Sequence, residues 1–301
     1  MCVGGSAPSV HVMGGQVFKG AVVGKRTALL AVAAVVTTMS LSSCVRLAQE
    51  SSSDDYTVND RITSVQIDND GGDVKIRAVE GASATTIKRT LRYGKASNKP
   101  SGPTHQVDGS ALVLKGCGNG CEAYYEVAVP SKETTVKGDV GSGDLEVQDL
   151  ASVDVTLGSG NATLKGIAGA VRVENGSGDV NGSDLKGGIT AKVSSGDFNV
   201  TGVTGEVTAV NSSGNIRAEK VDGDVSAEAS SGNVVVELAK AHNVKANAGS
   251  GDVTVTVPNG AYRVVVDAGS GDKKIDVKSD PSAQYELNLS ASSGDVALRA
   301  A

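Results

Sequence analysis

The residues of this 301-residue chain that could do chemistry fall into three sets: cysteines, histidines, and an Asp or Asn that recurs after glycine. The three histidines, His11, His105 and His242, lie in unrelated segments. A Ser-His-Asp triad needs a histidine held between a nucleophile and a carboxylate, and glycoside hydrolysis needs two converging carboxylates. Neither pattern is present, so we expect a protein that is not an enzyme, with no catalytic residue, no metal and no cofactor.

The recurring acid or amide ends a turn motif of Gly or Ser, then Ser, Gly, and Asp or Asn. The nine copies end at Asp144, Asn161, Asp179, Asp197, Asn215, Asn233, Asp252, Asp272 and Asp295. Glycine adopts positive φ at low cost, and Ser, Asp and Asn side chains bond to nearby backbone amides. We therefore interpret these residues as a structural ladder. They are also a weak candidate for calcium, which takes roughly six to eight oxygen ligands.

Between the turns, apolar and polar residues alternate with the period of two that is typical of β-strands. Phe198 and Val200 are apolar around Asn199, for example, and a second glycine such as Gly205 often divides the repeat. A unit of about eighteen residues with two short strands cannot bury its own apolar side, whereas stacked units can. The pattern predicts an all-β protein with a parallel β-helix, or β-solenoid, over residues 136–301. An antiparallel meander or sandwich is the competing fold.

Residues 56–135 depart from the repeat. The segment from Val65 to Ile76, around Gly71-Gly72-Asp73, resembles a first coil, and longer strands with an intervening polar loop follow it. An open solenoid end invites strand pairing with other chains. We therefore predict an N-terminal β entry or cap region over 56–135, in which Tyr124 and Tyr125 pack.

Composition agrees with thin stacked strands, because the chain has 39 glycines, no Trp, two Phe and six Tyr. All 34 acidic side chains follow Cys44, whereas three of the 28 basic ones precede it. Binding to a nucleic-acid backbone needs a basic surface. The acidic excess predicts no nucleic-acid partner.

The N-terminal segment is typical of an export signal. Lys25 and Arg26 precede the apolar residues 27–41, which are fewer than the roughly 20 needed to span a bilayer comfortably. The stretch ends in Leu41-Ser42-Ser43-Cys44, which resembles the lipobox of bacterial lipoproteins, whose cysteine is acylated and becomes the new N-terminus. A conventional signal peptide with a chance cysteine is the alternative.

The lipobox divides the chain into processed and mature parts. We predict a lipoprotein signal peptide over 1–43, lipidation at Cys44, and a flexible polar tether over 44–55. Cys117 and Cys121 flank a Gly-rich loop in the exported part, where disulfides are stable, so we predict a disulfide between them. A metal site would need further ligands nearby.

These features resemble the putative-adhesin family of bacterial β-strand-repeat lipoproteins, a family of unknown function, in its actinobacterial form. The matching residues are Ile67–Ile76, the Cys117/Cys121 loop before Tyr125–Pro130, and the Ser-Gly-Asp/Asn array from Gly141 to Asp295. The resemblance implies a β-solenoid at the cell surface and carries over no catalytic residue.

The functional expectation is therefore an extracytoplasmic protein, lipid-anchored to the bacterial cell membrane, that acts as a putative adhesin or a binding or spacer scaffold. A cell-wall polymer or a surface protein is the candidate partner, bound by many weak contacts along the outer surface. The alternatives are an envelope sensor or regulatory partner protein, and a polysaccharide-active enzyme on a β-helix.

Overall fold

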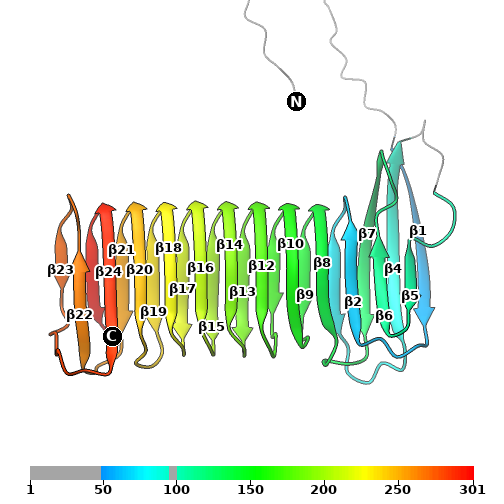
Figure 1. The fold of residues 1–301 in the computed structure, drawn as a ribbon. Helices are drawn as coiled ribbons and strands as arrows, with labels where there is room; N and C mark the ends of the chain where they lie inside the picture. Colours follow the sequence, from blue (N-terminus) through cyan, green and yellow to red (C-terminus); the bar gives the residue numbers. More distant parts are fainter. Residues whose placement is uncertain (1–48, 95–99) are drawn as a thin grey trace, which may run out of the picture. The chain divides into compact units, whose positions relative to one another are not determined.

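The computed structural model describes residues 49–94 and 100–301, which form two large sheets (Figure 1). Sheet A has thirteen strands in the order β1 (Gln49–Val58), β4 (Thr85–Gly94), β7 (Cys121–Val129), β3 (Val74–Ala78), β9 (Leu145–Gln148), β11 (Ala162–Lys165), β13 (Val180–Leu185), β15 (Phe198–Val203), β17 (Ile216–Val221), β19 (Val234–Leu238), β21 (Val253–Val257), β25 (Val296–Ala300) and β23 (Lys273–Ile275). Within the described ranges, no helix is long and apolar enough to cross a membrane.

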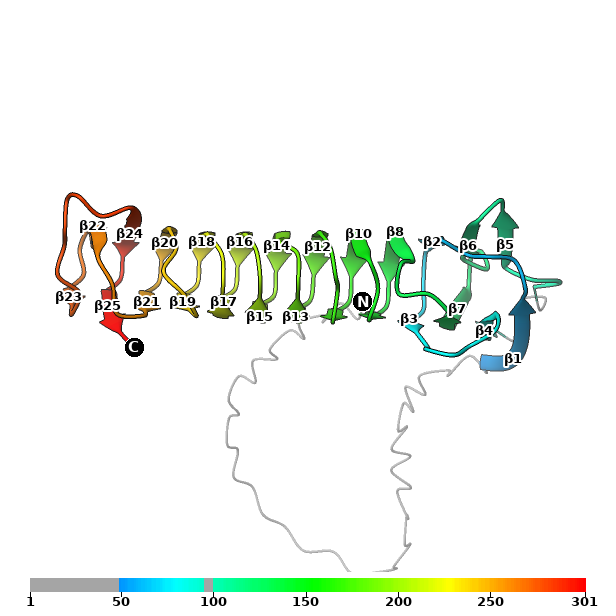
Figure 2. The same ribbon diagram turned by 90° about the horizontal axis from the view of Figure 1, so that it is seen from below.

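Sheet B has twelve strands and faces sheet A along the solenoid (Figure 2). Its order is β22 (Tyr262–Asp267), β24 (Tyr285–Ser293), β20 (Val244–Ser250), β18 (Val225–Ser231), β16 (Val207–Ser213), β14 (Ile189–Ser195), β12 (Val171–Ser177), β10 (Ser152–Ser159), β8 (Thr135–Ser142), β2 (Ser64–Asn69), β6 (Ala111–Lys115) and β5 (His105–Asp108). One strand of each sheet makes one coil. The predicted all-β parallel solenoid is confirmed.

The coils stack in register, which explains the period of the sequence. Phe198 lies between Val180 and Ile216 in sheet A, and all three side chains are fully buried. Their apolar faces meet those of sheet B in one continuous core built mainly from Val, Ala, Ile and Leu. Burying an aliphatic side chain of this size contributes about 1.5–3 kcal/mol. Stacking therefore supplies the burial that a single coil lacks.

The turn glycines allow neighbouring coils to approach closely. Gly214 has a φ of +135°, and a Cβ atom built on it would lie only 2.0 Å from the carbonyl oxygen of Gly196 in the preceding coil. Any other side chain would need both an unfavourable backbone conformation and a separation of the coils. Glycine is thus required here by the stacking itself.

At the C-terminal end, the spatial order of the coils differs from the sequence order. The β24/β25 coil lies between the β20/β21 coil and the β22/β23 coil, so the expected stacking of successive repeats is wrong for the last two. The physical reason lies in their interiors. Leu287 and Leu298 of β24/β25 are fully buried, whereas Lys273 of β23 occupies an inward position and donates from Nζ to the carbonyl oxygen of Val266 (2.8 Å). The coil with the lysine suits the open end.

At the N-terminal end, the cap region adds two coils and a curled sheet. The β2/β3 coil stacks on β8/β9, and β6/β7 stacks on its other side. Beyond these, β4 and β1 continue sheet A in antiparallel pairing. Residues 49–55, which we expected to belong to a flexible tether, instead form most of β1. Their polar side chains pack little, and backbone pairing with β4 orders them.

Candidate functional site

The Asp and Asn residues of the turns form a continuous ladder of hydrogen bonds. The Oδ1 atom of each, except Asp272 in the last coil, accepts the backbone N–H of its equivalent in the neighbouring coil, at 2.8–3.0 Å. In spatial order the ladder runs Asp73, Asp144, Asn161, Asp179, Asp197, Asn215, Asn233, Asp252, Asp295 and Asp272. The accepting atom is always Oδ1, which both residue types carry, and this explains why Asp and Asn exchange freely at these positions. The Nδ2 groups of Asn161 and Asn215 add a second hydrogen bond to the same Oδ1 atoms of Asp144 and Asp197.

The ladder residues therefore hold neighbouring coils together. These side chains are exposed or half-buried, and each that accepts a backbone N–H gives a partner to a donor that the turn would otherwise leave to solvent. In residues 49–94 and 100–301, no three His, Cys, Asp or Glu side chains are grouped so that they could hold a metal ion. The geometry of the ladder supports its structural interpretation.

A second set of turn side chains, which the repeat pattern did not reveal, lies inside the solenoid. Asn69, Asn175 and Asn211 are buried, and each donates from Nδ2 to backbone carbonyls of two turns. Asn211, for example, reaches the carbonyl oxygen of Gly196 at 2.8 Å. The signal in the sequence was an Asn at an inward, otherwise apolar position four residues before the ladder residue.

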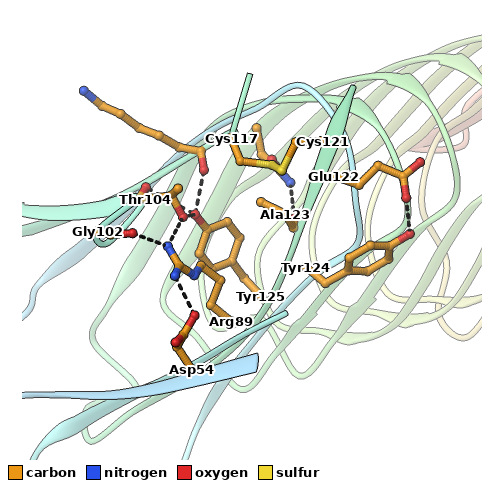
Figure 3. Close-up of a disulfide and its surroundings, with 12 residues drawn as sticks. Asp54, Arg89, Gly102, Thr104, Cys117, Cys121, Glu122, Ala123, Tyr124 and Tyr125 are labelled. Atoms are coloured by element: carbon orange, nitrogen blue, oxygen red, sulfur yellow. Dashed lines mark hydrogen bonds and ion pairs between the residues drawn. A yellow bond between two sulfur atoms is a disulfide. The ribbon is translucent and has the colours of Figure 1, made fainter. Parts of the chain in front are cut away.

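Cys117, in the loop after β6, lies beside Cys121, the first residue of β7 (Figure 3). Their sulfur atoms are at bonding distance and their Cα atoms are 5.6 Å apart, which suits a disulfide. Both side chains pack partly buried against the core beside Ala123. The bond would fix the entry to β7, the strand that carries Tyr125 into the cap.

We predict that the two thiols are oxidised in the exported protein. Alkylation without reductant should add no mass to the mature chain, and alkylation after reduction should add two groups. Replacing both cysteines by serine should cost about 2 kcal/mol of unfolding free energy, as expected for so short a loop. Two alkylated cysteines in the unreduced protein would contradict the prediction.

Arg89 of β4 is the centre of a polar cluster within the cap (Figure 3). Its side chain is only 2% exposed, and it bonds to Asp54 Oδ2 (2.7 Å), the Gly102 carbonyl oxygen (2.9 Å) and Thr104 Oγ1 (3.2 Å). The ring of Tyr56 lies 5.4 Å from its guanidinium carbon. Arg89 shares the inward side of β4 with Ile87 and Leu91. Its position in that alternation was the feature of the sequence that could have predicted its burial.

Tyr125 and Tyr124 occupy opposite sides of β7. Tyr125 is buried, as we expected for a cap residue, and its hydroxyl donates to the Lys115 carbonyl oxygen (2.6 Å) and contacts Thr104. Tyr124 instead lies on the outer side, where Arg92 stacks on its ring and its hydroxyl donates a hydrogen bond to Glu122 Oε2 (2.8 Å). The expectation that both tyrosines pack inside the cap is wrong for Tyr124.

His105 lies at the edge of this polar cluster, with its ring 4.5 Å from the ring of Tyr56. Partial burial, and secondarily the positive charge of Arg89, lower the pKa of His105 below its ordinary value near 6.5. The folded protein therefore binds a proton at His105 less readily than the unfolded chain does.

This difference predicts that stability falls in mild acid. The contribution of neutral His105 to the free energy of unfolding is fully present above the pKa of the unfolded chain, near 6.5. It is lost as the pH falls through that value toward the lower pKa of the folded protein. Thermal melts of wild type and His105→Gln between pH 7.5 and 5 should show a smaller decrease in the variant. Parallel curves for the two proteins would contradict this role of His105.

The remaining site candidates lie elsewhere. His242 lies between two carboxylates, with Nε2 3.0 Å from Asp222 and Nδ1 3.6 Å from Asp224, in a surface network that includes Lys240. Cys44, the signal peptide over 1–43 and His11 lie outside the described residues. The structure therefore brings the turn residues together in one ladder and, separately, places the two cysteines next to each other. His105 and His242 lie in different regions.

A hollow of about 540 Å³ opens on the outer face of sheet A at the cap end. Its floor consists of the outward side chains of β1, β4, β7, β3 and β9, and we call it the cap groove. In Figure 2, β1 starts low and its arrow rises toward the side of sheet B, so the sheet curls at this end, and Tyr56 of β1 contacts His105 of β5. The sequence pattern showed no sign of the groove, because β1 was expected to be a tether.

Two rows of side chains cross the floor of the groove. The first row alternates in charge, since register pairs Asp55 with Lys88, Lys88 with Glu126, and Lys75 with both Glu126 and Glu146. The second row, two residues further along β3, is Thr57, Thr86, Ala128, Arg77 and Gln148. Three of its five side chains are small, which leaves the hollow above them.

The fold and the ladder define a parallel β-solenoid protein with an N-terminal cap. Residues 59–299 match the family described as Toastrack DUF4097, and the chain belongs to this family. None of the curated proteins matches the chain.

Three solved structures show weaker similarity. They are a putative adhesin from Bacteroides fragilis NCTC 9343 (12% identity, 85% of this chain and 99% of that chain, TM-score 0.35), a putative adhesin from Parabacteroides merdae ATCC 43184 (12%, 84% and 96%, TM-score 0.34), and a putative cell adhesion protein from Clostridium sporogenes ATCC 15579 (11%, 84% and 100%, TM-score 0.22).

Proposed function

We propose that this protein is a non-catalytic lipoprotein of the bacterial cell surface, and that its solenoid is a binding or spacer scaffold of the envelope. The ladder is the observation that carries the proposal. Each repeated acid or amide except Asp272, in the last coil of the stack, accepts a backbone N–H of a neighbouring coil through its Oδ1 atom, so the most regular polar feature of the sequence serves length and rigidity. The Ser-Gly-Asp/Asn array and the Cys117/Cys121 loop support an actinobacterial type of the family.

Charges on the outer faces also support a scaffold. On sheet B, Arg172 of β12 pairs with Glu174 (2.6 Å) and Asp154 of β10 (3.9 Å), and Lys192 of β14 lies 3.9 Å from Glu174. Each exposed pair contributes little by itself, about 0–1 kcal/mol. Such a mixed surface suits many weak contacts with a cell-wall polymer or a surface protein, and these gain strength through their number.

The short distance between Cys44 and β1 supports anchoring close to the membrane. Because β1 begins at Gln49, five residue steps separate it from the proposed lipid-bearing cysteine. A fully extended chain of that length reaches about 18 Å. Lipid attachment at Cys44 would therefore hold the cap end of the solenoid near the bilayer, with stable anchoring if two or more acyl chains are attached.

Cell fractionation of a Cys44→Ala variant tests the proposal. We expect the variant to leave the membrane fraction or to persist as an uncleaved precursor, because the lipid acceptor is lost. Ser43→Ala is the matched control, since the lipobox accepts a small residue before the cysteine, and it should be processed and retained like the wild type. Normal processing and membrane retention of Cys44→Ala would overturn the proposal.

A further inference from the structure

The cap groove differs from the rest of the outer surface because its floor is hollowed at defined positions. Thr57, Thr86 and Ala128 are register partners on β1, β4 and β7. Their short side chains stand between the longer Lys88 and Glu126 of the first row and Arg77 of β3. The hollow runs across the strands from β1 to β9, and these small side chains lie in its part between β1 and β3.

The charges of the groove cancel in pairs, with two exceptions. Lys75 pairs with Glu146 (3.2 Å), and Lys88 pairs with Glu126 (3.5 Å). Arg77 on β3 and Asp55 on β1 are exposed, and neither forms an ion pair within the described residues. The β1 end of the groove therefore offers a carboxylate, and β3, three strands away, offers a guanidinium.

The separation of these two charges sets the length of a matching ligand. Three interstrand steps of about 4.8 Å, with an offset of two residues along the strand, place Asp55 and Arg77 about 16 Å apart. An extended peptide advances about 3.3 Å per residue, so five residues span this distance. Thr57 and Thr86 lie between the two ends and offer hydroxyls to peptide groups.

We propose that the cap groove binds a short extended peptide with a free amino group and a free carboxylate. The peptide ammonium lies at Asp55, and the peptide carboxylate accepts hydrogen bonds from the guanidinium of Arg77, whose planar donors match a carboxylate in pairs. The proposal goes beyond the scaffold function by assigning one discrete site, and it does not depend on lipid attachment.

Saturation-transfer NMR on the full-length chain in detergent, with penta-alanine as the probe, tests this site. We expect binding by penta-alanine with both termini free. Blocking either end, as in N-acetyl-penta-alanine or penta-alanine amide, should weaken binding about two- to fivefold, the range for one exposed charge pair. Absence of saturation transfer to penta-alanine, or equal binding of the three peptides, would overturn the proposal.

Two variants assign the ends of the peptide. In Arg77→Gln, blocking the carboxylate should cause no further loss, whereas blocking the amino group still should. In Asp55→Asn, blocking the amino group should cause no further loss, whereas blocking the carboxylate still should. Arg299→Gln is the matched control, because Arg299 occupies the same outward position of the β25 coil, four residues after its ladder aspartate.

Circular dichroism melts confirm that the variants are folded before binding is compared. A loss in Arg299→Gln as large as that in Arg77→Gln, or additive losses in place of the crossed pattern, would exclude the proposed orientation of the peptide. Membrane retention of the groove variants should equal that of the wild type, so failure of this site remains distinguishable from failure of the lipoprotein proposal.

Discussion

Deletion of the eighteen residues Asp197–Gly214 should leave a folded solenoid that is one coil shorter. The deletion joins Gly196 to Asn215, so one turn of the ladder replaces its equivalent, and β13 and β14 meet β17 and β18 in unchanged register. Each coil contacts only its neighbours, so the loss should be limited to the stability of one coil and one interface. Circular dichroism should show a single cooperative melt at a slightly lower temperature.

Deletion of only the nine residues Asp197–Gly205 should be far more damaging. It removes β15 and one turn but leaves β16, so the two sheets no longer advance together. The free energy of unfolding should fall by about 5 kcal/mol or more, because the burial of Phe198 and Val200 is lost and the edges of β13 and β17 are left unpaired. Equal damage from the two deletions would contradict the stacked arrangement.

Replacing Asp54 by asparagine should destabilise the cap strongly. The guanidinium of Arg89 is 2% exposed and loses its charged partner at 2.7 Å, while the charge itself stays buried. Breaking a buried pair in this way costs about 3–5 kcal/mol, and the lower end applies because Asp54 is partly exposed. Urea unfolding of wild type and variant measures the difference.

The neighbouring substitution Asp55→Asn is the control for this effect. Asp55 follows Asp54 on β1 but points to the outer face, so its loss should change the unfolding free energy by less than about 0.5 kcal/mol. Replacing Arg89 by methionine together with Asp54 by leucine should restore much of the stability, since an apolar pair leaves no buried charge. Similar losses in Asp54→Asn and Asp55→Asn would contradict the buried pair.

The solenoid was predictable because each repeat carries the same local evidence. The Gly of the turn, the Asp or Asn after it and the alternation of residues such as Phe198 and Val200 depend on the coil itself and its neighbours. Stacking then follows from the constant period. Val65 and Ile76 around Asp73 belong to the same pattern, which is why the first coil could be recognised far from the main array.

The cap and the ends could not be predicted in the same way, because they depend on contacts between distant segments. β1 is ordered by backbone pairing with β4, 37 residues away between Ser53 and Thr90, and its polar side chains carry no strand pattern. Without β1, neither the burial of Arg89 nor the cap groove could be inferred. The exchange of the last two coils depends on which of two similar coils buries its interior better, and Lys273 at an inward position was one local sign of it.

Mass spectrometry of the N-terminal peptide of the protein, isolated from membranes of cells that produce it, is the decisive test of lipid anchoring. We predict that the chain begins at Cys44, that this residue carries a diacylglyceryl group, and that Gln49 follows within the same peptide. A mature protein that begins at any other residue, or a Cys44 without lipid in membrane-associated protein, would contradict the view of this solenoid as a lipid-anchored surface scaffold.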